Sequence, residues 1–486
     1  MPDQLRSLSL ADLSRPWLQI PLPLSTEDLI QLTRTLDKPV LLTSHYRATK
    51  ESTRAHRSVK DRSRGNRYDI FTALPESVLA LNGPLHDLNA RLDQINTIRA
   101  FSNRWRLMAN PSTGELEKES LPFYSGIMGY ASYEWGAAHV AGAAQTIGSA
   151  LPRLHMAYYS WSYVYDSIDG QGFLTFSPLC TTEKRRKIIE AILYVLNSTS
   201  PSSRFGYRVS PWAAVLDKDS YVEKFTRVQN YLNAGDCYQI NLTQRFDSRI
   251  SGDSAALFRD LQASTQTPYS CYLSIDDDQQ ILSFSPEQFI EIRQDKIVTR
   301  PIKGTARNDQ AQETVDALLR SKKNQAENLM IVDLLRNDLS RFCQLNSVKV
   351  EELFALESFS NVHHLVSTVT GRLKPDITPM DAFLYCFPGG SITGAPKIRA
   401  MEIIDELEEG GRDAYCGSVF YWSDTDQFDS NILIRTIIRD GNALHCWGGG
   451  GIVIDSNAED EYEESVTKIQ NLMEASQAGS KDEASQ

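Results

Sequence analysis

The sequence has no apolar run near 18 residues, the length that a membrane-spanning helix needs, and its first residues lack the charged-then-apolar pattern of a secretion signal. It also has no surplus of basic residues, because 50 Lys and Arg stand against 62 Asp and Glu, a formal net charge of −12. Proteins that bind nucleic acid duplexes are usually basic. We therefore expect neither a membrane protein nor one whose main partner is nucleic acid.

Cysteines are few and scattered. They lie at positions 180, 237, 271, 343, 386, 416 and 446 and never form a CxxC pair. An odd number without a pairing pattern is typical of free thiols in a reducing compartment, so we expect a cytoplasmic protein without disulfides. None of the seven lies in a G-x-C-x-G setting, and no Ser-His-Asp order or nucleophile elbow is visible. The sequence thus predicts no glutaminase nucleophile of its own.

Repeats of 20–50 residues are also absent, which excludes solenoids and propellers. At 486 residues, 41% apolar and 23% charged, the chain predicts about three domains or one large two-layered unit. The best internal boundary is a Ser- and Pro-rich linker at 197–212, between an N-terminal region, 1–196, and a second region, 213–474. The small polar tail, 475–486, is predicted to be disordered.

The segment 46–67 differs from its surroundings, with eight Lys or Arg against two acids and almost no apolar side chains. It has too little apolar surface to build a core, which favours a solvated surface loop. A docking element for an acidic partner is the alternative.

Helical and strand patterns alternate along the second region. Helical periodicity at 219–233 ends at Gly235, and strand alternation follows at 238–246. Strand-like runs at 280–292 and 296–302 flank a two-residue turn, which indicates a hairpin. Further helices are expected near 312–337, 396–408 and 459–474. Strands mixed with helices in no strict βαβ order predict an α+β fold with two layered, largely antiparallel sheets and flanking helices.

Several carboxylates occupy helix positions where burying or crowding their charge costs free energy. Glu327 precedes Met330, Ile331 and Leu334 at helical spacing, which predicts that it lies on an apolar stripe. A buried carboxylate needs a cationic side chain or a metal ion. Glu461 and Glu464 share one face of the last helix, where acids also favour the helix dipole. Simple pairing and dipole compensation therefore compete with convergence on Mg²⁺, which takes one or two carboxylates plus water and substrate oxygens.

Two glycine-rich segments are candidate anion sites. The loop that opens 387–408 runs into a helix beginning near Pro396, and a helix N-terminus offers free N–H groups. It is not a Walker A loop, because Ala395 stands where Lys must follow. The second segment, 448–451, is four successive glycines that allow close backbone approach to a ligand. A plain turn is the alternative for each.

Three cationic or titratable residues complete the candidates. Arg435 lies in an apolar strand-like run, where an arginine usually pairs with a carboxylate of the protein or a ligand. Lys303 is either an exposed lysine or a nucleophile whose pKa its neighbours lower. His364, in the only His pair, is either a satisfied structural residue or a site residue.

Taken together, these segments resemble the chorismate-utilising enzymes. The resemblance is dense across 219–474 and looser before it, through LLTS, YDIF, PFYSGIMGYASYEW and LPRLHMAYYSW. The motifs that carry it are GDCYQINL, SFSPEQF, TRPIKGT, AENLMIVDLLRND, HHLVS, FPGGSITGAPKIRAMEIIDELE, YCGS, NILIRT and GGGIVIDS followed by EYEE.

The resemblance implies a two-sheet sandwich with its active site in the cleft between the sheets, and a dicarboxylate substrate, chorismate, with a hydroxyl leaving group. It implies direct Mg²⁺ binding by Glu327 and Glu464, with Glu461 acting through water. Glu287 would be the general acid–base, and His364 and Thr393 would orient the leaving hydroxyl. The implied substrate-binding residues are Gln239, Lys397, Tyr421, Arg435 and the N–H groups of Gly448, Gly449 and Gly450.

Two positions separate branches of this family. Lys303 stands where anthranilate synthases have Ala, and in the aminodeoxychorismate-forming branch this lysine is the nucleophile at ring carbon 2. Gln239 stands where isochorismate and salicylate synthases have a Lys that activates water. The resemblance therefore implies that chorismate and ammonia give 4-amino-4-deoxychorismate, in 4-aminobenzoate and folate synthesis. A separate glutamine amidotransferase subunit would supply the ammonia.

Two rival functions stay open at this point. One is anthranilate formation, against which Lys303 speaks. The other is a non-catalytic, tryptophan-binding relative, although every expected acid and the nucleophile are present. The resemblance also leaves open whether tryptophan binds in the N-terminal region. One departure is Asn324, where relatives often have an acid, so one carboxylate around Mg²⁺ would be missing.

Overall fold

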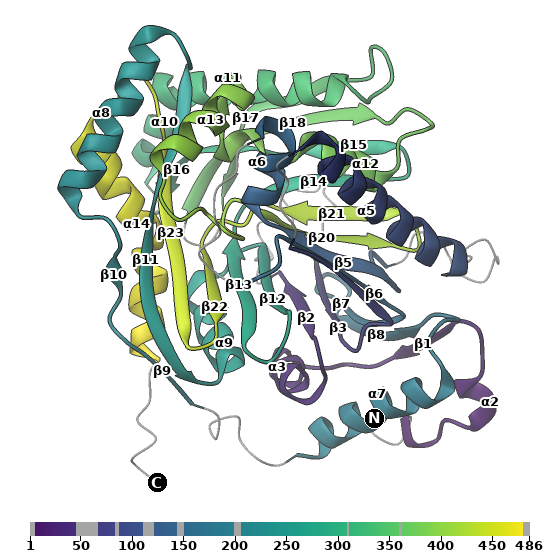
Figure 1. The fold of residues 1–486 in the computed structure, drawn as a ribbon. Helices are drawn as coiled ribbons and strands as arrows, with labels where there is room; N and C mark the ends of the chain where they lie inside the picture. Colours follow the sequence, from purple (N-terminus) through teal and green to yellow (C-terminus); the bar gives the residue numbers. More distant parts are fainter. Residues whose placement is uncertain are drawn as a thin grey trace.

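The computed structural model describes residues 5–44, 67–82, 87–109, 121–142, 150–198, 206–308, 311–358 and 362–479. In this part of the chain two large antiparallel sheets pack together, and helices flank them (Figure 1). The predicted α+β class, with two layered antiparallel sheets and flanking helices, is confirmed. No helix among the described residues is long and apolar enough to cross a membrane.

The first sheet has 13 strands, and its main path runs from a strand of the N-terminal region to a strand of the second region. In spatial order it contains β1 (Leu18–Pro21), β8 (Gln171–Phe176), β7 (Trp161–Asp166), β3 (Tyr68–Thr72), β2 (Val40–Thr43), β12 (Tyr269–Ser274), β13 (Gln279–Ser285), β22 (Thr436–Asp440), β23 (Ala443–Ile452), β11 (Gln239–Gly252) and β10 (Ala213–Ala214), while β9 (Tyr207–Val209) and β19 (Gly394–Ala395) also pair with β11.

The second sheet has ten strands. In spatial order it contains β16 (Ile302–Arg307), β18 (Val362–Arg372), β15 (Lys296–Thr299), β14 (Gln288–Arg293), β21 (Gln427–Asn431), β20 (Ser418–Ser423), β5 (Gly126–Ala131), β6 (Leu154–Tyr159) and β4 (Ser77–Leu81), while β17 (Lys349–Ser358) pairs with β18.

The described helices lie outside the sheets or between their ends (Figure 1). They are α2 (Leu10–Leu13), α3 (Thr26–Thr35), α5 (Leu88–Ala109), α6 (Tyr133–Ala141), α7 (Thr182–Asn197), α8 (Lys218–Ala234), α9 (Ser254–Thr265), α10 (Gln312–Arg320), α11 (Lys322–Ser340), α12 (Pro379–Cys386), the 3₁₀ turn η3 (Gly390–Ile392), α13 (Lys397–Leu407) and α14 (Ala458–Ala478).

Two hydrophobic cores cover the two faces of the first sheet. In β12, Cys271 and Leu273 join the core that also contains residues of the second sheet, while Tyr272 joins the core beneath α3, α7 and α9. Because both faces are buried, polar residues on these strands are buried too, Gln239 among them. The alternation at 238–246 therefore predicted the strand but could not tell which face meets water.

Local signals explain most element ends. The Asp217 side chain accepts a hydrogen bond from the Ser220 N–H (2.8 Å) at the start of α8, and Gly235 ends that helix with φ 80°. The predicted hairpin is also present, since β14 and β15 pair around Gln294, at φ 57°. The predicted helix at 312–337 is instead two, because Ser321 ends α10 and caps α11.

The strand predicted over 280–292 is divided between the sheets. Its first half is β13 in the first sheet and its second half is β14 in the second. The chain changes sheets at Pro286–Glu287, where proline has no N–H for a ladder.

The two regions on either side of 197–212 share both sheets. N-terminal β2 pairs with β12, and N-terminal β5 pairs with β20. The predicted disordered tail begins too early, because α14 continues to Ala478 and Ser476 is buried, accepting a hydrogen bond from the Trp212 indole (3.0 Å). Residues 480–486 lie outside the described residues.

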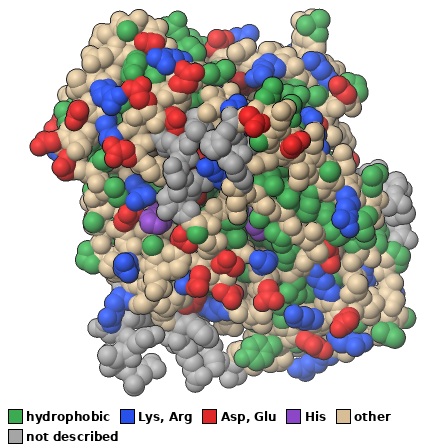
Figure 2. Space-filling model, viewed as in Figure 1, with side chains coloured by type: hydrophobic (Ala, Val, Ile, Leu, Met, Phe, Trp, Pro, Cys, Tyr) green, Lys and Arg blue, Asp and Glu red, His purple; other side chains and the backbone are tan. Residues whose placement is uncertain are grey.

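Most of the basic segment, 46–66, also lies outside the described residues. Its last member, Arg67, donates to the Asp166 carboxylate and forms an ion pair with Asp169 at 3.1 Å. Acidic and basic side chains are interspersed on the face shown in Figure 2, as the moderate net charge leads one to expect.

Candidate active site

Two of the places where the second half of the chain crosses between the sheets lie side by side. One is Pro286–Glu287, between β13 and β14, and the other is 432–435, between β21 and β22. The Ile432 N–H donates to the Glu287 carbonyl (3.1 Å), and the Phe284 N–H donates to the Arg435 carbonyl (3.0 Å). Glu287 and Arg435 are therefore held at one junction of the two sheets.

The sequence predicted that Arg435 lies within a strand, and this prediction was wrong. Arg435 lies at a bend with φ 51° just before β22. Its side chain is largely covered, and burial lowers the pKa of its guanidinium. Among the described residues no carboxylate forms an ion pair with it. A covered guanidinium without an acidic partner is suited to a ligand carboxylate.

Lys303 lies on β16 at an irregularity of the strand. The pairing register with β18 shifts between Ile302 and Thr305, and Gly304 has φ 80°. A bulge of this kind re-aims a side chain away from the regular pleat. The half-buried Lys303 ammonium lies 3.4 Å from the Ser391 carbonyl, and its charge acts on Glu287 and Glu327.

Glu287 is a buried acid. Burial raises the pKa of its carboxyl, and the Lys303 ammonium and a hydrogen bond with the Ser391 side chain only partly oppose that rise. The carboxyl beside Lys303 is thus more readily protonated than an exposed glutamate.

Three further carboxylates come from two helices. Glu327 is on α11, and Glu461 and Glu464 are on the first turns of α14. Glu461 is buried and accepts a hydrogen bond from the Ser456 hydroxyl (2.7 Å), while Glu464 pairs with Lys468 at 2.7 Å. The charges of Glu461 and Glu464 act on Glu327, so the two helices bring their acids close together, which the sequence left open as one alternative.

The glycines of β23 make room for these acids. A Cβ atom at Gly450 would lie 2.9 Å from a carboxylate oxygen of Glu461 and 3.6 Å from one of Glu464. Any side chain at this position would enter the space between the strand and the acids. The glycines lie within β23 rather than in a turn, so the plain-turn alternative is excluded for 448–451.

Burial and mutual repulsion set the charge state of the acids. Burial raises the pKa of Glu327, with the charges of Glu464 and Glu461 adding to the rise. Burial also raises the pKa of Glu461. Glu464 differs, because its side chain is 49% exposed and the remaining burial effect is outweighed by Lys468, so its pKa lies below the ordinary value. Glu327 is only half-buried, on the flank of the α11 stripe, and not within it as predicted.

His364 lies near Arg435, and Thr393 follows two residues after Ser391. His364 is buried on β18, its Nδ1 lies 2.9 Å from the Thr305 hydroxyl, and burial, with the nearby Arg435 charge, lowers its pKa to about 4. It is therefore neutral near pH 7. The buried Thr393 hydroxyl donates to the Gly389 carbonyl (3.0 Å), which leaves its oxygen lone pairs to accept.

Gln239 begins β11 and packs against Gly451, and it is fully buried. Neither polar atom of its side-chain amide has a hydrogen-bond partner among the described residues. A buried amide without hydrogen bonds destabilises the fold unless a ligand or a water molecule supplies the missing hydrogen bonds.

The strand edge beside Arg435 is open. β22 pairs with β23 only as far as Cys446, and continuing that register would place Arg435 opposite Gly448. Since the opposite edge of β23 pairs with β11, alternate N–H groups of the glycine run face the open edge. These N–H groups and the guanidinium of Arg435 can hold one carboxylate between them.

Residues 69–474 match the protein family described as chorismate binding enzyme. This match covers most of the chain and includes every residue of the site. The chain belongs to the chorismate-binding enzymes.

The relatives of this chorismate-binding enzyme include aminodeoxychorismate synthase component 1 of Klebsiella aerogenes, 38% identical over 84% of this chain and 90% of that protein. Anthranilate synthase component 1 of Bacillus subtilis is also 38% identical, over 53% of this chain and 50% of that protein. Among solved structures, anthranilate synthase component I from Streptococcus pneumoniae is 26% identical with a TM-score of 0.72, over 89% of this chain and 99% of that one.

Two expected substrate-binding residues of this chorismate-binding enzyme make contacts with other parts of the protein. The Lys397 ammonium is tied to the Asp338 carboxylate (2.5 Å) and the Cys386 carbonyl (3.0 Å), so its charge is already compensated. The Tyr421 ring packs edge-on against Phe123 of the N-terminal region. The ring of Tyr415 stacks on Trp447, next to Gly448.

Sequence reasoning missed two residues of the site. Ser391 contacts both Lys303 and Glu287, and it lies inside the quoted loop motif without a chemical signal of its own. Lys468 also donates to the Gly449 carbonyl (2.9 Å), and its position four residues after Glu464 could have found it. Asn324, the expected departure, packs against Gly304 beside Lys303.

The donor set around Glu327 fits Mg²⁺ chemically, since all three side chains offer hard oxygen ligands. No group of three His, Cys, Asp or Glu in the described part of the chain is arranged to hold a metal ion by itself. Instead, Lys468 and Lys323 compensate the acids, the latter 3.7 Å from Glu461. Mg²⁺ commonly takes only one or two protein carboxylates, so these observations are compatible with a site that substrate completes.

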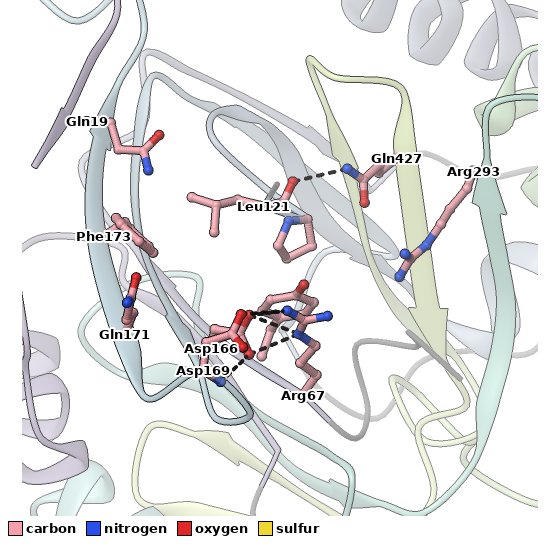
Figure 3. Close-up of a pocket in the computed structure, with 11 residues that line it drawn as sticks. Gln19, Arg67, Leu121, Asp166, Asp169, Gln171, Phe173, Arg293 and Gln427 are labelled. Atoms are coloured by element: carbon pink, nitrogen blue, oxygen red, sulfur yellow. Dashed lines mark hydrogen bonds and ion pairs between the residues drawn. The ribbon is translucent and has the colours of Figure 1, made fainter. Parts of the chain in front are cut away.

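Two cavities of the described chain lie outside this cluster. One of about 300 Å³ separates Arg67 and Asp166 from Arg293 and Gln427, and no predicted site residue lines it (Figure 3). Another, of about 480 Å³, is an outer groove between Tyr238, α11 and Pro396. Neither cavity is lined by Lys303 or Glu287, so the chemistry and not the cavity size identifies the site.

Proposed function

We propose that this chain converts chorismate and ammonia to 4-amino-4-deoxychorismate. The observation that supports it most directly is the Lys303 amine beside the buried acid Glu287, with both contacting Ser391. The similarity to aminodeoxychorismate synthase component 1, which spans most of both chains, supports the same reaction.

After its ammonium form has given up a proton, the amine of Lys303 attacks ring carbon 2 and forms a carbon–nitrogen bond. Both ring double bonds move one position toward carbon 4, and the bond from carbon 4 to its hydroxyl breaks. Glu287, whose pKa burial raises, protonates the departing hydroxyl, which leaves as water. Ammonia then bonds to carbon 4, both double bonds move back, and the carbon–nitrogen bond at carbon 2 breaks to release the amine of Lys303. The new ammonium group on carbon 4 returns a proton to Glu287.

Arg435 and the open edge of the glycine run bind one carboxylate of the substrate. The guanidinium has no acidic partner among the described residues, and the alternate N–H groups of β23 face the same side. His364, neutral because its pKa is about 4, and Thr393 orient the leaving hydroxyl. Gln239 completes the pocket with its unpartnered amide.

Glu327 and Glu464 hold Mg²⁺ directly in this proposal, and Glu461 holds it through water. When bound, the metal acts as a Lewis acid and template for the ring carboxylate. Its support is the convergence of the three carboxylates and the space that Gly450 leaves in front of them.

Ammonia comes from a separate glutamine amidotransferase subunit in this proposal. The seven cysteines are all buried and free, which leaves no exposed thiol nucleophile in the chain. Tryptophan binding in the N-terminal region and a cytoplasmic location stay predictions from the sequence.

Anthranilate formation is the second candidate, since an anthranilate synthase matches about half of the chain. The two products are easily separated, because anthranilate is fluorescent and aminodeoxychorismate is converted to 4-aminobenzoate only by an added lyase. We expect incubation with chorismate, Mg²⁺ and ammonium, followed by chromatography, to give aminodeoxychorismate. Anthranilate as the main product would refute the proposal.

A further inference from the structure

A buried arginine next to the site ties three elements together. Arg412 is 1% exposed and forms a bidentate pair with Glu408, both bonds being 2.7 Å long. The same guanidinium donates to the Ile392 carbonyl (2.8 Å) and the Asn241 carbonyl (2.6 Å), and it lies over the Tyr133 ring. It contacts no residue that the proposed reaction uses.

The backbone that Arg412 holds carries part of the site. Ile392 stands between Ser391, which contacts Lys303 and Glu287, and the buried Thr393. The segment is fastened to β11 a second time, because the Asn241 N–H donates to the Thr393 carbonyl (2.9 Å).

Glu408 strengthens the same connection from the other side. Besides pairing with Arg412, it accepts a hydrogen bond from the Thr243 N–H (2.8 Å) on β11. Glu408 follows the last turn of α13, so the pair joins that helix to β11 and to the turn η3.

We propose that Arg412 is a positioning residue for the reaction: it fixes the 391–393 segment against β11, so that Ser391 and Thr393 stay in place around the amine of Lys303 and the acid Glu287. The inference rests on the proposed function, because it assigns Arg412 a role in that same site. Reacting groups tolerate little displacement, and an error of about 1 Å can cost a hundredfold in rate.

Lysine at position 412 keeps the charge but cannot reproduce a planar donor set that reaches a carboxylate and two carbonyls at once. We therefore expect Arg412→Lys to lower kcat for the ammonia-dependent reaction about tenfold or more. KM for chorismate should change less than about threefold, because Arg435 and β23, which bind its carboxylate, are not held by Arg412.

Arg185 provides a matched control. It is also buried and donates to four backbone carbonyls, those of Leu13, Arg15, Pro16 and Ser177, at 2.6–3.0 Å. These lie around α2, β1 and α7, far from α11 and α13 in Figure 1. Arg185→Lys should lower the thermal midpoint as Arg412→Lys does, yet leave kcat within about twofold of the unchanged protein.

Steady-state kinetics and thermal unfolding of the full-length variants, assayed well below both midpoints, separate the roles. A kcat loss confined to Arg412→Lys supports the inference. The inference is overturned if both variants keep the kcat of the unchanged protein, or if both lose kcat to the same extent. If Arg412→Lys does not fold, Glu408→Gln replaces it, with an expected kcat loss of several-fold, and unchanged kcat there overturns the inference. Absence of product with the unchanged protein would instead refute the proposed function.

Discussion

At the residue scale, the site separates acids by environment. Glu287 is buried beside Lys303 and Ser391, and its pKa is raised. Glu464, paired with Lys468, has a pKa below the ordinary value. Carboxyls whose pKa values move apart can serve as proton donor and as permanent anion in one site.

Lys303 gives the sharpest prediction at this scale. Lys303→Ala should fold normally but lose ammonia-dependent activity by on the order of a hundredfold or more, because it removes the amine that contacts Ser391, whose side chain forms a hydrogen bond with Glu287. Product formation at saturating ammonium is the measurement. Lys322→Ala, which removes an exposed lysine from the start of α11, is the control and should stay fully active. Undiminished turnover by Lys303→Ala would remove the nucleophilic role.

The raised pKa of Glu287 also predicts a pH-dependent stability. The folded protein holds this proton above the ordinary carboxyl pKa of 4.5, so Glu287 makes folding less favourable as pH rises from there through the folded pKa. Glu287→Gln should therefore lose activity at least about tenfold yet be more stable at pH 7–8. The stability gain should shrink as pH falls through 4.5 and vanish below about pH 4, where both states are protonated. Thermal unfolding across pH 4–8 tests this, and a variant that is less stable at pH 7–8 would contradict it.

The proposed metal ligands make a third prediction. Glu327→Gln and Glu464→Gln should each weaken Mg²⁺ binding tens-fold, because each removes one anionic oxygen ligand. Glu463→Gln, an exposed neighbour on α14, should bind Mg²⁺ as before. Titration calorimetry with Mg²⁺ and chorismate gives the affinities. Wild-type affinity in both ligand variants would show that the acids serve only the helix dipole and Lys468.

At the element scale, strand β23 and helix α14 fit together only because the strand is glycine-rich. A Cβ at Gly448 would overlap the backbone of Ser465, and one at Gly450 would meet Glu461. The first glycine allows the helix to approach the strand, and the second leaves space for the acids. The two glycines thus serve packing and chemistry respectively.

Gly450→Ala tests that division. The added methyl meets the far end of a flexible side chain, so stability should change little while the Glu461 carboxylate is displaced. We expect activity to fall about tenfold and the half-saturating Mg²⁺ concentration to rise. Gly206→Ala, where nothing lies within 4 Å of the new Cβ, is the control. Unchanged kinetics in Gly450→Ala would show that the acids do not face this glycine during the reaction.

At the scale of the whole molecule, the site forms where the chain passes between the two sheets at two neighbouring points. Glu287 lies at one crossing and Arg435 at the other. N-terminal strands complete both sheets, so the catalytic second region does not form the sandwich alone. A single compact layer could not bring a buried acid, a covered cation and two helix ends together.

The whole chain should also lack glutaminase activity. All seven cysteines are buried, and burial raises the pKa of the Cys416 and Cys446 thiols to about 12. We expect purified protein to form product with ammonium but not with glutamine. Adding a glutamine amidotransferase subunit should restore the glutamine-dependent rate. Product from glutamine in a preparation free of any glutaminase would contradict the prediction.

The sequence alone determined the features that depend on neighbours along the chain. Periodicity, caps and turn residues predicted α8, the β14–β15 hairpin and the α+β class, because each reflects local backbone preferences. Family motifs pointed to Lys303, Glu287, Arg435 and the acids of α11 and α14. In the structure the charge of Lys303 acts on Glu287, Glu327 and Glu464. Glu287 and Arg435 lie at one junction of the two sheets.

Only the tertiary structure decided what depends on contacts between distant segments. The split of 280–292 between two sheets, the pairing of Lys397 with Asp338 and the place of Tyr421 beside Phe123 are set by partners far away in sequence. Both faces of the first sheet are buried, so the strand alternation did not mark a solvent-facing side. Burial also raises the pKa of Glu287 and lowers that of His364 to about 4. Solvation and Coulomb energies depend on distance in space, which the order of residues does not state.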